Sequence, residues 1–222
     1  MRFFFEENGY AVAKNFLSQE ELHALLHCCA PVSSQYGVRK LLERLPAIKD
    51  ILFSPKLCAL LGSLGYAGAK PVRSLFFNKN AAHNWLVPWH QDLSIAVAQK
   101  MDIDGYSKWT IKDGAHYVEP PVAILESILT LRFALDNSDE DNGALRVIPG
   151  SHLLGKLKAE EIQILQQDRI AVSCNVQAGD LLLMKPLLLH SSSKAAKPSD
   201  RRVIHLETSA KVLPIPMNWA EC

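Results

Sequence analysis

Residues 131–152, LRFALDNSDEDNGALRVIPGSH, contain two short runs of β-forming residues with a polar segment between them. Asn142-Gly143 predicts a tight turn in the polar segment, because both residue types tolerate the backbone conformations that such turns require. Pro149-Gly150 predicts a second turn directly after the second run. Short strands bounded by turn signals in this way are typical of antiparallel sheets. This stretch therefore predicts antiparallel β-structure.

The same pattern extends over most of the chain from Pro71 onward. Short β-rich runs alternate with turn signals such as QAGD and PGSH. Many short strands that follow a helical segment predict an antiparallel barrel or jelly roll with helices packed on one side. The runs are PVRSLFFNKN, PWHQDLSIAV, ILTLRFALD, ALRVIPG, IAVSCNV, DLLLMKPLLLH and RRVIHLETS.

Residues 1–70 have a different pattern, in which helices follow one short strand in GYAVAKNFLS. Ser18 is a candidate N-cap, and Glu21 three residues later completes a capping box for the helix SQEELHALLHCCA. VRKLLERLPAIKDIL predicts a second helix that is broken near Pro46, and SPKLCALLGSLG predicts a third. We expect one domain over residues 1–222, with a helical portion (1–70) and a jelly-roll core (71–222).

Composition and charge exclude several classes of function. The chain has 222 residues, 48% hydrophobic and 21% charged, which is ordinary for a globular protein with a sizeable core. A formal net charge of +1 argues against a nucleic-acid partner. No signal peptide and no run of membrane-spanning length stand out, so we expect a cytoplasmic protein with no membrane partner. No zinc-ligand spacing or disulfide framework joins the cysteines, which are Cys28, Cys29, Cys58, Cys174 and Cys222.

The segment PWHQDLS, residues 88–94, places a histidine two residues before an aspartate. On a strand, His90 and Asp92 project from the same face, and Gln91 faces away. An imidazole and a carboxylate on one face are either half of a metal site or a simple hydrogen-bonded pair. The motif alone does not separate these interpretations.

A second histidine, His190, ends the apolar run GDLLLMKPLLLH about a hundred residues later. By itself this pattern favours a hydrogen-bonded core histidine. Two histidines and one carboxylate, however, leave coordination positions open, as in non-haem Fe(II) oxygenases. A 2-oxo acid bound there needs a cation for its far carboxylate, and an arginine offers a planar fork that matches it. Arg201 and Arg202 follow His190 at the start of the next predicted strand.

Several of these motifs, in this order, resemble the phytanoyl-CoA dioxygenase family of Fe(II)/2-oxoglutarate oxygenases. The resemblance covers most of the chain and implies a mostly β fold, a double-stranded β-helix (jelly roll, cupin-like) core with N-terminal helices packed on one side. It also implies iron bound by His90, Asp92 and His190, with 2-oxoglutarate as cosubstrate. The motifs are GYAVAKNFLSQEEL, PWHQDL, LRFALDNSDEDNGALRVIPGSH, GDLLLMKPLLLHSSS and DRRVIHLETS.

The resemblance assigns two residues to the distal carboxylate of the cosubstrate. Arg201 aligns with the arginine that binds this carboxylate, and Ser192 aligns with a supporting hydroxyl. Strand parity does not separate Arg201 from Arg202, because both faces of the strand contain apolar residues. The alternative for Arg202 is a solvated ion pair with Asp200.

Two further residues are candidates for the cosubstrate pocket. Arg132 shares one face of its strand with Thr130 and Ala134, and inside a barrel its charge would need an anion. That anion is the cosubstrate, an acidic substrate or an internal Asp or Glu. Asn78, on the strand before the HxD motif, is either a donor to the 2-oxo acid or a turn residue.

The segment WTIKDGAHYVEPP, residues 109–121, is rich in side chains that bind small molecules. We interpret it as a substrate lid, with an ordinary surface loop as the alternative. The residues assigned to the substrate are Gln91, Trp109, Lys112 and His116.

The predicted function is a dioxygenase that uses Fe(II), 2-oxoglutarate and dioxygen to hydroxylate a small molecule, with release of succinate and CO2. A halogenase of the same fold is disfavoured, because that chemistry usually replaces the metal carboxylate by a small residue and Asp92 is present. A catalytically divergent jelly-roll protein that binds a metal or ligand is the second alternative.

Overall fold

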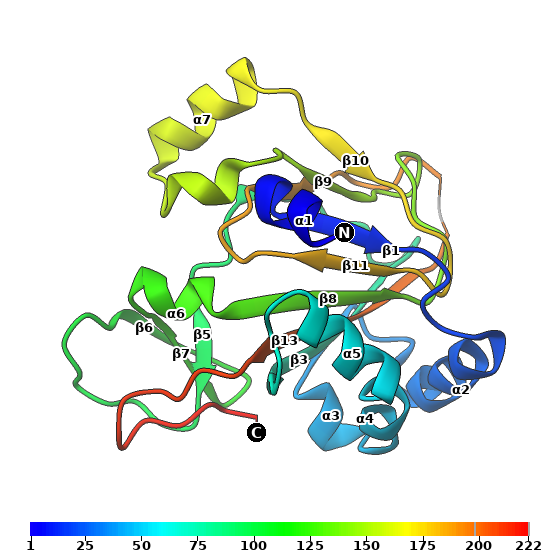
Figure 1. Cartoon of the computed structure of the whole chain (residues 1–222). Helices are drawn as coiled ribbons and strands as arrows, with labels where there is room; N and C mark the ends of the chain where they lie inside the picture. The colour runs from blue at the N-terminus through cyan, green and yellow to red at the C-terminus, as the bar shows by residue number, and fades with distance from the viewer. Residues whose placement is uncertain (198, 222) are drawn as a thin grey trace.

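The larger of two facing sheets has six antiparallel strands in the order β1-β11-β8-β13-β3-β2 (Figure 1). The computed structural model describes residues 1–197 and 199–221. Strands β3 and β13 keep one register from the Arg201–Lys79 pair to the Glu207–Arg73 pair, and the register shifts after Glu207. Between these pairs, alternate side chains face the inside of the fold and the others face outward. The strands are β1 (Tyr10–Ala13), β2 (Gly37–Arg39), β3 (Lys70–Lys79), β8 (Ile128–Ala134), β11 (Leu181–Met184) and β13 (Arg201–Ser209).

The second sheet has four antiparallel strands in the order β10-β9-β12-β4. Its inner side packs against the larger sheet through one apolar cluster that includes Leu145, Val147, Leu182 and Met184. Two facing antiparallel sheets of this kind form the predicted jelly roll. The strands are β4 (Val87–His90), β9 (Leu145–Val147), β10 (Val172–Cys174) and β12 (His190–Ser192).

Helices from the first part of the chain cover the outer face of the six-stranded sheet (Figure 1). Leu25, Ile48 and Leu57 on these helices join one buried cluster with Phe76 and Ile204 on the strands. The capping box at Ser18 and Glu21 is confirmed. The predicted second helix is divided into two, with β2 before them. The helices are α2 (Gln19–Cys29), α3 (Leu41–Arg44), α4 (Ala47–Leu52) and α5 (Pro55–Ser63), with a 3-10 turn at Ala30–Val32.

A third sheet, with the order β5-β7-β6, lies beside the roll (Figure 1). Asp113 and Gly114 join β6 to β7, and both have positive φ, 49° and 74°, as a two-residue hairpin turn requires. The segment interpreted as a loop-like lid is therefore a β-hairpin. The strands are β5 (Ile95–Val97), β6 (Ser107–Lys112) and β7 (Ala115–Glu119).

Several short elements were not expected from the sequence. They are α1 (Arg2–Asn8), α6 (Val122–Glu126), α7 (Ala159–Asp168) and a 3-10 turn at Ser151–Leu154. Helix α7 buries none of its residues, so it has no apolar stripe strong enough to predict it. In the described part of the chain no helix has the length and apolar character to cross a membrane. Cys28, Cys29, Cys58 and Cys174 are free thiols, and Cys222 lies outside the described residues.

Candidate functional site

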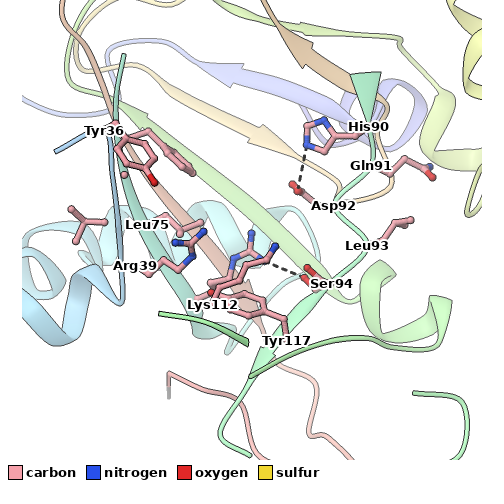
Figure 2. A pocket seen from close by; sticks show the side chains of 14 residues that line it. Tyr36, Arg39, Leu75, His90, Gln91, Asp92, Leu93, Ser94, Lys112 and Tyr117 are labelled. Carbon is pink, nitrogen blue, oxygen red and sulfur yellow. Dashed lines mark hydrogen bonds and ion pairs between the residues drawn. The ribbon is translucent and has the colours of Figure 1, made fainter. Parts of the chain in front are cut away.

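Two neighbouring strands of the four-stranded sheet bring His90 and His190 together. The two residues are direct partners in the β4/β12 pairing, and their rings lie 4.2 Å apart between centroids at 50°. Asp92 follows β4, where its backbone N–H donates a 2.9 Å hydrogen bond to the carbonyl of Pro186. This bond fixes the chain as it leaves β4. The carboxylate turns back toward the imidazole of His90, as Figure 2 shows, and it also faces the imidazole of His190.

The three side chains are spaced for a metal ion. His90 Nε2 lies 3.9 Å from Asp92 Oδ1, and His190 Nε2 lies 3.7 Å from Asp92 Oδ2. Metal-to-ligand bonds of about 2.0–2.2 Å allow two donors on one ion to be up to about 4.4 Å apart. The His-Asp-His group is therefore a candidate metal site whose donors fit Fe(II).

Backbone carbonyls determine which nitrogen of each histidine is available. His90 Nδ1 donates to the carbonyl of Pro88 at 2.9 Å, and His190 Nδ1 donates to that of Leu188 at 2.8 Å. These partners assign the proton to Nδ1 and leave the lone pair on Nε2, the atom that faces Asp92. Both rings are thus held in the tautomer that binds a metal.

The charge states of the ligands also suit a cation. Burial opposes ionisation of Asp92, but His190, Arg73, His205 and His90 together lower the pKa of the carboxyl well below its usual range. Burial is the main cause that lowers the pKa of His190 to about 4. Asp92 is therefore ionised and His190 neutral at physiological pH, as metal ligands must be.

The inner faces of β3 and β13 continue the site. Arg201 is the direct partner of Lys79, and four residues further along β13, His205 is the partner of Leu75. Because alternate residues share a face, Arg201 and His205 point inward with Lys79. Arg202 points outward, where it makes a two-pronged ion pair with Asp136 at 2.8 and 2.7 Å. The partner of Arg202 is thus Asp136 rather than the expected Asp200.

Three cations gather on this inner face, of which Lys79 and Arg201 are buried and Arg132 is partly buried. Burial, together with Arg132, lowers the pKa of Arg201, and burial with Arg201 and Arg132 lowers that of Lys79 to about 8. Arg201 makes no ion pair within the described residues, and its Nε has no hydrogen-bond partner there. Buried positive charge of this kind is costly without an anion. The cluster of Lys79, Arg132 and Arg201 is therefore a candidate anion site.

Ser192 connects the anion site to the metal ligands. It lies two residues after His190 on β12, and its hydroxyl accepts a 2.9 Å hydrogen bond from Lys79 Nζ. The same hydroxyl donates to the carbonyl of Gly143 at 2.7 Å. A side chain at position 143 would meet the carbonyl of Ser193 at 2.5 Å, and φ is +78° there, so only glycine fits this close approach.

Arg132 is held by an internal partner at one end. Its Nη1 donates to His205 Nδ1 at 3.0 Å, and His205 Nε2 lies 3.5 Å from a carboxylate oxygen of Glu207. Glu207 in turn pairs with Arg73 at 3.0 Å. Asp92, His205 and Glu207 form a second cluster of possible metal ligands. The two arginines that contact it would repel a cation, so the His-Asp-His group is the better metal site.

One residue predicted for the site has another position. Asn78 lies on the outer face of β3, where its amide donates to the carbonyl of Ser33 at 2.7 Å, so the candidate cosubstrate site does not include it. Gln91 is among the residues that line the cavity beside His90 and Asp92, but its amide is bound to the backbone. It donates to two backbone carbonyls at 2.8 and 2.7 Å and accepts a 2.8 Å bond from the backbone N–H of Leu157. Its side chain therefore holds loops together.

A cavity of about 310 Å³ lies beside His90 and Asp92 (Figure 2). Of the segment predicted to contact the substrate, Lys112 lines this cavity and is joined there by Tyr117. Trp109 packs against the apolar cluster around Ile95 instead. His116 alternates with Tyr117 on β7 and pairs with Ile111 and Val97, so it lies on the other face of the hairpin.

Four residues in the interior of the roll are not among the predicted site residues: Lys79, Arg73, His205 and Glu207. Lys79 lies in NKN, a segment that looks like a turn, although β3 continues to this residue. The alternation of polar and apolar residues in RRVIHLE was visible, and inward-facing polar residues on a strand are a usable signal. Which face was inward depended on the register with β3, which the sequence does not contain.

The chain resembles known proteins in sequence. A family model described as phytanoyl-CoA dioxygenase matches residues 5–203. The Mus musculus protein "Phytanoyl-CoA dioxygenase domain-containing protein 1" is 25% identical over 241 aligned positions, which cover 100% of this chain and 70% of the mouse protein.

Solved structures of iron oxygenases share the fold. EctD from S. alaskensis, solved with 2-oxoglutarate and 5-hydroxyectoine, has a TM-score of 0.73 at 17% identity, over 94% of this chain and 74% of EctD. The same protein has also been solved with bound Fe. SnoK, a non-heme alpha ketoglutarate dependent carbocyclase from nogalamycin biosynthesis, has a TM-score of 0.72 at 16% identity, over 93% of this chain and 81% of SnoK. At these identities the likeness establishes the jelly-roll architecture.

Proposed function

Because the chain belongs to the phytanoyl-CoA dioxygenase family, we propose that it is an Fe(II)- and 2-oxoglutarate-dependent oxygenase that hydroxylates a small molecule. One observation carries the proposal: a His-Asp-His group and a buried cluster of cations without a matching anion lie in the interior of the same roll. The first is suited to the metal, and the second to the far carboxylate of the cosubstrate. Iron and 2-oxoglutarate, when bound, supply the oxidative decarboxylation to succinate and CO2 that activates dioxygen.

The residues of the chain have separate tasks in this proposal. His90, Asp92 and His190 hold the metal and leave the remaining coordination positions free. The guanidinium of Arg201 binds the distal carboxylate with a planar fork, and Lys79 and Ser192 support it from the neighbouring strands. Arg132 adds positive charge between the carboxylate site and the metal.

The buried surroundings strengthen this binding. Lys79 and Arg201 are almost inaccessible to solvent, at 0% and 6% exposure. A bound carboxylate is therefore their partner in place of bulk water. Ion pairs in such a setting are screened much less than those at a surface. The cosubstrate is thus held in one orientation, with its 2-oxo acid end toward the metal ligands.

The proposal is tested by turnover of 2-oxoglutarate in the absence of a prime substrate. Purified protein is supplied with Fe(II), 2-oxoglutarate and dioxygen, and succinate is measured by mass spectrometry. We expect slow formation of succinate that depends on iron and is lost in Asp92→Ala. The exposed Asp102→Asn variant, which removes a carboxylate elsewhere, is expected to retain it.

One alternative gives a different result in this assay, and a second is distinguished when a prime substrate is present. A protein that binds iron and 2-oxoglutarate but forms no succinate would be a ligand-binding protein of the same fold, and the proposal would be wrong. Carbocyclisation, the activity named for SnoK, differs from hydroxylation in the product. Transfer of an oxygen atom from ¹⁸O₂ into the product identifies hydroxylation.

A further inference from the structure

The cavity beside the metal ligands carries an excess of positive charge. Arg39, Arg73 and Lys112 all line it, and Asp92, a proposed metal ligand, is the only acidic residue among the side chains that do. Leu75, Phe77 and the ring of Tyr117 supply apolar wall. The cavity thus combines an apolar lining with cationic groups.

These cations differ in how far their charge is already neutralised. The charge of Arg73 is already neutralised, because Arg73 pairs with Glu207 at 3.0 Å and donates to the carbonyl of Ser94 at 3.1 Å. Lys112 has no ion pair among the described residues, and its Nζ lies 5.4 Å from the centre of the Tyr117 ring. Lys112 therefore has charge available for a ligand.

Arg39 is paired only with a group outside the cavity. Its Nη1 lies 2.5 Å from Asp113 Oδ2, and the side chain of Asp113 is 58% exposed on the β6/β7 turn. Asp113 follows Lys112 directly, so the ion pair brings the ends of β2 and β6 together at the cavity. Figure 2 shows Arg39 and Lys112 near each other. An exposed pair of this type contributes little energy and is readily exchanged. A ligand carboxylate can therefore replace Asp113 on the Arg39 fork.

We propose that the substrate is a small organic carboxylate, and that Arg39 and Lys112 bind its carboxylate while its apolar part lies between Phe77 and Tyr117. This inference rests on the proposed function, because that function identifies the cavity as the substrate site. Arginine is suited to the role, because its planar fork matches a carboxylate. The cavity of about 310 Å³ is at the small end of the range of about 300–1,000 Å³ for ligand pockets, so it suits a metabolite of modest size.

The charge at the cavity is tested with matched pairs of ligands. Aliphatic and aryl carboxylates, 3-phenylpropionate among them, and their primary amides are titrated by calorimetry under anaerobic conditions. The protein is loaded with Fe(II) and saturating 2-oxoglutarate, which occupies the separate anion site at Arg201. We expect at least one carboxylate to bind about tenfold more tightly than its amide. If every amide binds as tightly as its carboxylate, or if no carboxylate binds, the inference is wrong.

Variants then assign the preference to residues. Lys112→Ala and Arg39→Ala should each reduce carboxylate affinity about tenfold and leave amide affinity unchanged. Lys108→Ala is the matched control, because Lys108 lies on the same strand but pairs with Glu119 and does not line the cavity. Equal losses in Lys108→Ala and Lys112→Ala would show a general effect of charge and overturn the assignment.

Asp113→Asn gives a test in the opposite direction. Asparagine tolerates the positive φ of 49° at this position, so the turn is preserved while the competing carboxylate is removed. The affinity of the carboxylate should rise about threefold, since exposed ion pairs are worth about 0.2–1 kcal/mol. A decrease would mean that Asp113 supports the binding conformation and does not compete with the ligand, which would overturn the role given to Arg39.

Failure of this inference is distinct from failure of the proposed function. Succinate formation without a preference for carboxylates would retain the oxygenase and reject the substrate class. If the protein did not bind 2-oxoglutarate, the same titrations on unloaded protein would still test the role of Arg39 and Lys112 in anion binding. A preference that is lost in both variants would then support an anion site in a protein of another function.

Discussion

Lys79 and Arg201 are direct partners across the β3/β13 ladder, and both side chains are buried on the inner face. Like charges opposite each other destabilise a sheet. An anion bound between the two side chains in the active protein would offset this repulsion and account for the pair.

Binding of 2-oxoglutarate should weaken as the pH rises through about 8. Burial, followed by Arg201 and Arg132, lowers the pKa of Lys79 to about 8 in the ligand-free protein. A bound carboxylate favours the charged ammonium, so binding above this pH requires Lys79 to take up a proton. Calorimetric titrations between pH 7 and about 9.5 in buffers of different ionisation enthalpy measure both the affinity and the proton uptake. The Lys79→Met variant should bind more weakly and lose this pH dependence. An unchanged pH profile in Lys79→Met would show that Lys79 does not contribute to the 2-oxoglutarate site.

The same pKa shift predicts a change in stability without ligand. The pKa of Lys79 is lower in the folded protein than the value of about 10.4 in an unfolded chain. The unfolded state therefore binds more protons between these two pH values, and the free energy of unfolding should rise with pH across this window. Urea unfolding of the wild type and Lys79→Met measures the difference. A wild-type stability that falls relative to the variant in this window would contradict the shift.

The two adjacent arginines should respond differently to replacement. Removal of one partner of a buried ion pair costs about 2–5 kcal/mol, so Arg201→Ala should raise the dissociation constant for 2-oxoglutarate at least about tenfold. Arg201→Lys should restore only part of the affinity, because an ammonium lacks the planar fork. Arg202→Ala should leave affinity nearly unchanged but reduce the free energy of unfolding by about 1–3 kcal/mol, since it breaks the bonds to Asp136. Calorimetry and denaturation measure the two effects, and a larger loss of affinity at Arg202 would contradict the assignment.

Iron binding should depend on the carboxylate between the two histidines. Asp92→Ala removes the group that lies 3.9 and 3.7 Å from the two Nε2 atoms. We expect affinity for Fe(II), measured anaerobically by calorimetry, to fall at least about tenfold, with Asp102→Asn unchanged. If the triple variant His90→Ala, Asp92→Ala, His190→Ala kept full affinity, the metal would lie elsewhere.

Gln91 should contribute to stability more than to binding. Its buried amide makes three hydrogen bonds to the backbone of three separate residues. Gln91→Ala leaves these groups without partners, at a cost of about 1–3 kcal/mol for each one that stays buried. The melting temperature should fall by several degrees, with the dissociation constant for 2-oxoglutarate within a factor of about two. A normal melting temperature with weakened substrate binding would instead support the predicted role of Gln91 in binding the substrate.

Local sequence signals predicted one helix cap and most strands. The capping box at Ser18 and the run of short strands after Pro71 depend on residues close together in sequence. The place of Asn78 and Lys79 depends instead on how β3 pairs with β13. A shift of one residue would exchange their faces, and nothing in NKN distinguishes the two registers.

The hairpin at Asp113 shows a different limit of sequence analysis. The dipeptide Asp-Gly is a strong signal for a two-residue turn, and Lys112 and Ala115 on either side are paired as it predicts. The residue types of the segment favour a substrate lid, and that interpretation does not include the turn signal. Trp109 and His116 were assigned to the substrate on residue type alone, whereas the alternation along β6 and β7 directs Lys112 and Tyr117 to the cavity.

The carbonyl groups of Pro88 and Leu188 orient the two imidazoles, and each belongs to the main chain two residues before its histidine. Side-chain replacements at positions 88 and 188 leave these acceptors in place. Alanine substitutions around the metal ligands would therefore not remove the backbone carbonyl groups that orient the two imidazoles. The neighbouring positions can diverge during evolution while the rings keep their direction, provided that the path of the two strands is maintained.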